Sequence, residues 1–184
     1  MTRSLADVAR ILAEAGRPVV LVDGGAGAGK STLVQRLVQA WPAREPRVVP
    51  LDDLYPGWTG LAAGSDAVHR TVLRADNPGY RRWNWATARP GDWVRIDPAE
   101  PLIIEGCGAL TATNRSRATA GIWVSGSPRA RRERALKRDG DLFAPHWDMW
   151  AAQERAHWRR NRPRDLADWI AVGGQLRPRT GSRR

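Results

Sequence analysis

The sequence has very little cysteine and no long apolar run. Cys107 is its one cysteine, so an internal disulfide is impossible, which fits a reducing compartment. No apolar stretch approaches the roughly 18 residues that indicate a membrane-spanning helix. Residues 1–18 carry charges among their apolar positions, so we expect neither a signal peptide nor a membrane span there. These absences disfavour a disulfide-stapled or membrane-embedded protein and predict a cytoplasmic one.

Several functional signatures are also missing. The three histidines are scattered without metal-ligand spacing, so we expect structural or surface roles for them: His69, His146 and His157. The guanine-reading pattern Asn-Lys-x-Asp does not occur, which argues against a GTPase. No internal repeat is present.

Length and charge narrow the organisation of the chain. With 184 residues and 42% hydrophobic residues, we expect one domain over residues 1–175, followed by a basic, disordered tail over 176–184. The net charge of +11 is concentrated, because residues 128–164 hold 11 basic and five acidic residues. A local basic segment suits a polyphosphate ligand better than a diffuse nucleic-acid surface. The oligomeric state stays open at this point.

Short β-branched runs alternate with amphipathic segments along the chain. We expect strands at 18–23, 47–51, 101–105, 119–124 and 168–172, and helices at 3–15, 30–41, 65–75, 128–139 and 146–161. Residues 55–97 are otherwise the least regular part. The alternation predicts an α/β three-layer sandwich, with a five-stranded, mostly parallel sheet covered by helices on both faces.

A glycine-rich stretch between the first strand and the following helix matches the pattern G-x-x-x-x-G-K-[ST] in full. It consists of Gly24, Gly25, Ala26, Gly27, Ala28, Gly29, Lys30 and Ser31. Small residues let the backbone wrap closely round a polyphosphate with its N–H groups pointing inward. Lys30 can reach the β- and γ-phosphates of ATP, the Ser31 hydroxyl can ligate Mg²⁺, and Thr32 offers a weaker second hydroxyl. The motif predicts ATP binding without separating kinases from other nucleotide-binding proteins.

Two other predicted strands end in acids. Asp52 follows the second strand and Glu105 ends the third. Ligands of an open parallel sheet sit beyond the carboxyl ends of its strands, where a carboxylate can accept a hydroxyl proton or hold Mg²⁺. The alternatives are a turn-capping role for Asp52 and a structural ion pair for Glu105. Asp53 is open between a metal shell and a loop position.

With the phosphate loop, the segments Asp52-Asp53-Leu54-Tyr55 and Glu105-Gly106 resemble the uridine kinase-like branch of P-loop kinases, which also holds phosphoribulokinase-like and pantothenate kinase-like enzymes. The resemblance covers roughly residues 17–175. It implies that Asp52 is the general base on an acceptor hydroxyl, that Tyr55 lines the acceptor pocket and that Glu105 supports the magnesium. The nucleoside-gripping segment usual in that branch is replaced by residues 80–85, which leaves the acceptor open.

An arginine-rich segment over residues 128–139 places Arg131, Arg134 and Arg138 on one helical face. Phosphoryl transfer needs cations around the γ-phosphate. In the resembling kinases a helix with such arginines forms a lid, so Arg134 and Arg138, with Arg131 after them, are lid candidates. The alternative is a solvated basic face.

Ten tryptophans are many for this length. Trp83 and Trp85 alternate about an asparagine and follow Arg82, so the three could stack on and hydrogen-bond a planar acceptor. Local packing is the alternative. Three further tryptophans at helical spacing are expected to form a core face: Trp147, Trp150 and Trp158.

The leading hypothesis is a small-molecule kinase with ATP and Mg²⁺ as donor and a hydroxyl acceptor. A nucleoside such as uridine or cytidine is the favoured acceptor, and a phosphorylated sugar or another small alcohol is its competitor. The second hypothesis is an ATPase or regulatory module without such an acceptor. The third, a nucleic-acid-binding protein, is disfavoured by the clustering of the charge.

Overall fold

The computed structural model describes residues 2–42 and 44–179, and its main sheet has six strands in the order β2–β5–β1–β6–β7–β8. The first five of these run parallel, and β8 is antiparallel to β7. Their bounds are β1 (Val19–Asp23), β2 (Arg47–Pro50), β5 (Leu102–Glu105), β6 (Ala120–Ser125), β7 (Trp169–Val172) and β8 (Gln175–Pro178). The expected α/β class with a mostly parallel sheet is confirmed.

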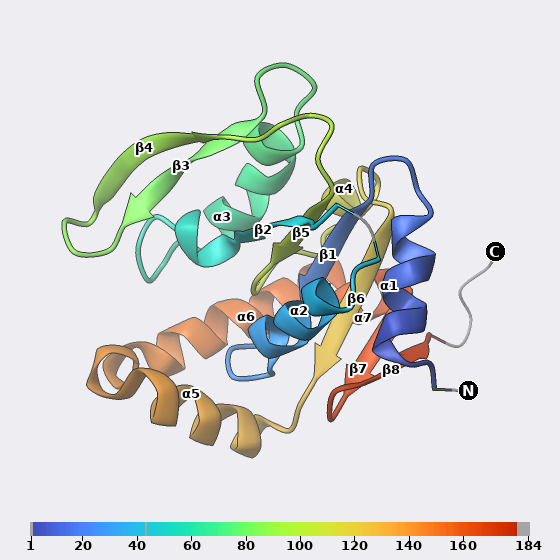
Figure 1. Ribbon diagram of the computed structural model, residues 1–184. Helices are drawn as coiled ribbons and strands as arrows, with labels where there is room; N and C mark the ends of the chain where they lie inside the picture. The colour runs from blue at the N-terminus through green and yellow to red at the C-terminus, as the bar shows by residue number, and fades with distance from the viewer. Residues whose placement is uncertain (1, 43, 180–184) are drawn as a thin grey trace.

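Helices cover both faces of this sheet (Figure 1). Alternate residues of β1 point to opposite faces, so Val20 and Val22 pack with α1 and α2 whereas Leu21 packs in the core on the other face. Within residues 2–42 and 44–179, no helix is long and apolar enough to cross a membrane. The helices are α1 (Leu5–Ala13), α2 (Lys30–Gln39), α3 (Leu61–Ala67), α4 (Ala112–Arg115), α5 (Pro128–Phe143), α6 (Trp147–Asn161) and α7 (Pro163–Leu166), with helical turns η1 (Leu51–Asp53), η2 (Val68–Val72) and η3 (Ala144–His146).

The sixth strand corrects both the expected strand count and the expected start of the tail. Gly173 and Gly174 adopt positive φ angles of 57° and 80°, which lets the chain reverse in two residues and lay β8 against β7. Leu176, expected in the tail, is only 1% exposed. The domain therefore continues to at least Pro178, and residues 180–184 lie outside the described part.

A second hairpin corrects the expectation that residues 55–97 are largely irregular. The strands β3 (Gly79–Asn84) and β4 (Arg89–Arg95) form a separate two-stranded sheet that packs against η1 and η2. The helix expected at 65–75 begins earlier, as α3, and continues through η2. Figure 1 shows the hairpin extending from the main sheet on the side of α3.

The position of Leu176 makes a first prediction. Because its side chain is buried, Leu176→Ala should lower the free energy of unfolding by about 2–5 kcal/mol in urea denaturation. Val172→Ala is the control, since Val172 is 48% exposed and should cost less than about 1 kcal/mol. Equal effects of the two substitutions would contradict the assignment of β8 to the folded domain.

Candidate active site

The phosphate loop joins β1 to α2. Gly27 and Gly29 have φ angles of 71° and 96°, and Gly29 is the N-cap of α2, so both positions use the left-handed conformation that glycine tolerates best. Among the described residues, nothing hydrogen-bonds the backbone amides of Gly27, Gly29, Lys30 and Ser31. Free amides at the start of a helix, where its dipole is positive, form a binding site for an anion.

Lys30 lies at this loop with its side chain almost fully buried. Its Nζ donates to the Gly25 carbonyl at 3.2 Å and contacts the Cys107 Sγ at 3.4 Å. Burial alone would lower the pKa of Lys30, but the neighbouring acidic groups, among them the carboxylates of Glu105 and Glu154, outweigh it and raise that pKa. Lys30 is therefore a protonated cation at neutral pH, as phosphate binding requires.

Ser31 and Glu105 meet at the same edge of the sheet. The Ser31 hydroxyl, in the first turn of α2, donates to the Glu105 carboxylate at the end of β5 over 2.8 Å. Both are oxygen ligands, which Mg²⁺ prefers, and Mg²⁺ commonly takes only one or two protein ligands beside waters and substrate phosphates. In the part of the chain that the structure describes, no cluster of three or more His, Cys, Asp or Glu side chains could hold a metal by itself. The pair fits a magnesium ion that arrives with a nucleotide.

Asp52 lies in η1, directly after β2, whose last residue pairs with Glu105 in the sheet. No described residue hydrogen-bonds its carboxylate, which lines the same cavity as Lys30 and Glu105. The carboxylate stays accessible through the cavity, but the surrounding protein displaces much of its water. This desolvation raises the pKa of Asp52, against the opposing charges of Lys30 and Arg138. A free carboxylate with a raised pKa is suited to accept a proton.

These groups open into one cavity of about 660 Å³. Its other lining is aromatic: Trp58 stacks on His146 at 4.3 Å between ring centroids and lies 5.0 Å from Trp85. Tyr55 and Trp150 meet edge to face at 4.9 Å. A cavity of this size with an acidic group, a buried lysine and an aromatic wall is large enough for a small planar molecule.

The structure places Tyr55 and Trp85, both expected at the acceptor pocket, in this cavity lining. The Tyr55 hydroxyl donates to the Cys107 carbonyl at 2.8 Å, and burial raises its pKa well above the ordinary value, so it stays a neutral phenol. The Trp85 Nε1 donates to the Asp52 backbone carbonyl at 2.9 Å. Trp85 thereby joins the β3–β4 hairpin to the segment that carries Asp52.

Arg82 and Trp83, also expected at the acceptor, are not among the residues that line the cavity. Arg82 pairs instead with Asp53 at 3.1 Å, and the Tyr80 hydroxyl donates to the same carboxylate at 3.3 Å. Asp53 thus anchors the hairpin to η1, a contact of the kind that the loop alternative expects. Trp83 is half-buried on the hairpin.

The three arginines expected in the lid make two kinds of contact. Arg138 lines the cavity but is paired with its neighbour Asp139 at 2.6 Å. Arg134 donates to the Gly27 carbonyl at 2.7 Å, and Arg131 donates to the Ala26 carbonyl at 3.0 Å. In this structure α5 therefore holds the outside of the phosphate loop through two arginines and presents one to the cavity.

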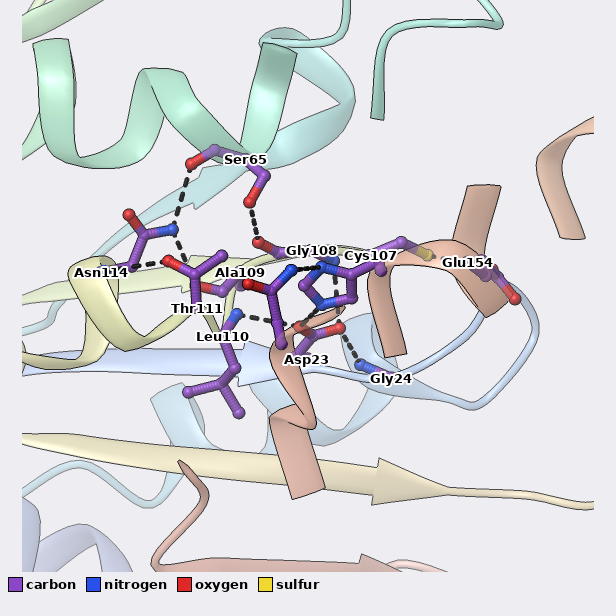
Figure 2. Close-up of polar contacts among 12 residues, drawn as sticks. Asp23, Gly24, Ser65, Cys107, Gly108, Ala109, Leu110, Thr111, Asn114 and Glu154 are labelled. Carbon is purple, nitrogen blue, oxygen red and sulfur yellow. Dashed lines mark hydrogen bonds and ion pairs between the residues drawn. The ribbon is translucent and has the colours of Figure 1, made fainter. Parts of the chain in front are cut away.

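Two residues that hold the phosphate loop were missed in the sequence: Asp23 and Glu154. Asp23 ends β1 and is fully buried, and Figure 2 shows its carboxylate between Gly24 and the loop after β5. It accepts from the amides of Gly24, Gly108 and Leu110 at 2.6–3.1 Å and contacts the His157 Nε2 at 3.1 Å. As a strand-ending acid it satisfies the criterion that identified Asp52 and Glu105.

Glu154 is harder to find from the sequence. It lies on the inward face of α6, four residues after Trp150, and is 1% exposed. Its carboxylate accepts from the Ala26 amide and from Arg131, both at 2.5 Å, and from the Cys107 thiol at 3.3 Å. Its position in a predicted core face is the one available signal, because buried acids are rare without a partner.

No protein-family profile matches the chain. A bifunctional pantoate ligase/cytidylate kinase from Gloeobacter violaceus is 30% identical over 79% of this chain. The chain spans 36% of the length of that relative.

Solved structures are similar over most of both chains. A candidate uridine kinase from Bacillus stearothermophilus has a TM-score of 0.62 and 18% identity, over 91% of this chain and 97% of the other. A candidate fructose transport system kinase from Silicibacter sp. TM1040 has a TM-score of 0.55 and 20% identity, over 90% and 95%. A shikimate kinase from Bacteroides thetaiotaomicron has a TM-score of 0.50 and 13% identity, over 85% and 87%. At these identities the likeness is one of fold.

The contact between Ser31 and Glu105 makes a second prediction. If both oxygens hold one magnesium ion, Ser31→Ala and Glu105→Gln should each raise the Mg²⁺ concentration needed for half-maximal ATP binding. In the double variant, the rise in this Mg²⁺ concentration should not exceed the product of the two single rises, since both residues act on the same ion. Calorimetric titration with ATP at several Mg²⁺ concentrations measures this. Unchanged magnesium dependence in both single variants would contradict the assignment.

Proposed function

We propose that this chain, which has the P-loop kinase fold that its sequence motifs predict, transfers the γ-phosphoryl group of ATP to a hydroxyl of a small molecule. One observation carries the proposal. The phosphate-loop lysine, the Ser31–Glu105 pair and the free Asp52 carboxylate all line one cavity, and the rest of that cavity is wide enough for an acceptor.

The residues divide the chemistry among them. The free loop amides and Lys30 bind the polyphosphate and balance its charge. Ser31 and Glu105 would hold Mg²⁺, which supplies charge neutralisation at the phosphates when bound. Asp52 accepts the proton of the acceptor hydroxyl as that oxygen approaches the γ-phosphorus, and its raised pKa makes it a stronger base than an ordinary aspartate. Holding the acceptor hydroxyl between Asp52 and the phosphate loop lowers the barrier further, because the reacting groups are already in place.

The acceptor that we propose is a nucleoside of the uridine or cytidine type. The aromatic lining by Trp58, Trp85 and His146 suits a planar base, because aromatic rings stack on either face of it. A phosphorylated sugar would need cations of its own, and Arg138 in the cavity is already paired with Asp139. A candidate uridine kinase and a bifunctional cytidylate kinase are among the similar proteins, and both are named for acceptors with a pyrimidine base.

The role of Asp52 makes a third prediction. In a panel of nucleosides, sugars and small alcohols, ATP-dependent phosphorylation of one acceptor should appear. Its kcat/KM should fall as pH decreases through the raised pKa of Asp52, since only the deprotonated carboxylate can accept the proton. The acid limb of the profile should therefore lie above the ordinary aspartate value of about 3.9.

The Asp52→Asn variant provides the decisive arm. Its kcat should fall about 10²–10⁴-fold while it still binds ATP. The control is Asp92→Asn, at an exposed position on β4, whose kcat should stay unchanged. Full turnover in Asp52→Asn would refute the base assignment. ATP hydrolysis without any phosphorylated acceptor would favour the ATPase module instead.

The aromatic lining makes a fourth prediction. Trp85→Ala should raise the KM for the acceptor about tenfold and leave the KM for ATP unchanged, because a stacked base is worth about 1–3 kcal/mol. Trp85→Phe keeps an aromatic face but loses the hydrogen bond to the Asp52 carbonyl, so it should recover most of the affinity. Trp93→Ala is the matched control, since Trp93 is similarly exposed on the same hairpin but lies outside the cavity lining. An unchanged acceptor KM in Trp85→Ala would exclude stacking of the acceptor on Trp85.

A further inference from the structure

The backbone N–H and C=O of Ala26, in the middle of the phosphate loop, are both held by one buried ion pair. The Glu154 Oε1 accepts from the Ala26 amide at 2.5 Å, and the Arg131 Nε donates to the Ala26 carbonyl at 3.0 Å. The other carboxylate oxygen and the guanidinium Nη2 pair with each other at 2.5 Å. The three groups thus close a ring in which both backbone atoms of Ala26 are satisfied by charged partners.

Both charged side chains of this ring are buried. Arg131 is 7% exposed and Glu154 is 1% exposed, and the guanidinium lies 5.0 Å from the centroid of the Trp158 ring. A Cβ atom at Gly25 would overlap the guanidinium of Arg131, and one at Gly27 would overlap its backbone carbonyl. Two glycines of the loop are therefore required by its contact with α5 as well as by any phosphate.

The ring separates two kinds of backbone amide in the loop. The Ala26 amide is committed to Glu154, whereas the amides of Gly27, Gly29, Lys30 and Ser31 meet no partner in the described chain. Placing a carboxylate beside an anion site would ordinarily repel a phosphate. Here the Arg131 guanidinium balances the charge of Glu154, so the site keeps the positive potential of Lys30 and of the helix N-terminus.

We infer that Arg131 and Glu154 are positioning residues for the nucleotide: they hold the phosphate loop in its anion-binding shape before ATP arrives. A glycine-rich loop has many conformations, and ordering it on binding would weaken affinity. Charged hydrogen bonds to the N–H and to the C=O of Ala26 fix two successive peptide groups of the loop and remove much of that cost in advance. The inference rests on the proposed nucleotide site and goes beyond it by assigning roles to two residues on α5 and α6.

The experiment compares two carboxylates of like chemistry. Glu154 accepts from an arginine and a backbone amide, and so does Asp168, from the Arg115 Nη2 and the Gly121 amide, both at 2.8 Å. Asp168 lies away from the phosphate loop, so Asp168→Ala reports what losing such a carboxylate does to the fold alone. Both variants are assayed at a temperature where circular dichroism shows them folded.

Glu154→Ala should weaken binding of Mg²⁺–ATP at least about tenfold by calorimetry, as expected for losing a charged hydrogen bond, and Asp168→Ala should leave it unchanged. Without nucleotide, amide hydrogen exchange over residues 24–31 should be faster in Glu154→Ala than in the wild type. A positioning role demands both changes, whereas a purely structural role would move only the free energy of unfolding.

The double variant Arg131→Met/Glu154→Leu covers the case in which Glu154→Ala does not fold. Replacing both charges with apolar side chains leaves no buried unpaired charge, so the double variant should fold yet bind Mg²⁺–ATP as weakly as the single variant. Wild-type affinity in either folded variant would overturn the inference. Because the readout is nucleotide binding, it stands even if no acceptor is phosphorylated, and failure of the kinase proposal would appear separately in the acceptor panel.

Discussion

The central constraint in this structure is that every backbone group of the phosphate loop needs a partner, and that several amides must be left for the ligand. Burying an unpaired peptide group costs free energy comparable to a lost hydrogen bond. The carbonyls of Ala26 and Gly27 face away from the site and are satisfied by Arg131 and Arg134 of α5. The position of α5, and with it the shape of the cavity beside Arg138, follows from that requirement.

Two strands of the central sheet end in a carboxylate and a third is followed by one, and the partners of each carboxylate decide what it can do. Asp23 is fully buried and accepts hydrogen bonds from three backbone amides. Its role is therefore to order the loops around it. Glu105 accepts a hydrogen bond from the Ser31 hydroxyl, which suits an ion bound beside the two oxygens. Asp52 keeps a free carboxylate in the cavity. Only a group without internal partners remains available to take a proton from a substrate.

The elements with a local signal were predictable, and those that depend on distant pairing were not. The strands near residues 19–23 and 102–105 are continuous apolar runs, which a buried parallel strand requires. The β3–β4 hairpin was missed because its alternation is interrupted by charged and glycine residues and its strands pair mainly with each other. The strand β8 was missed although Gly173-Gly174 is a hairpin signal, because the arginines around it resemble a solvated tail.

By itself the sequence determined the phosphate loop, the parallel α/β order and the acids at the strand ends, because each depends on residues that are adjacent in the chain. The tertiary structure alone decided that Glu154 and Arg131 enclose Ala26, from 128 and 105 residues away. It also decided that Arg82 pairs with Asp53 and that Trp85 lines the cavity. Such pairings depend on how helices and hairpins pack over the sheet, and no local pattern encodes which of several arginines or tryptophans will face the site.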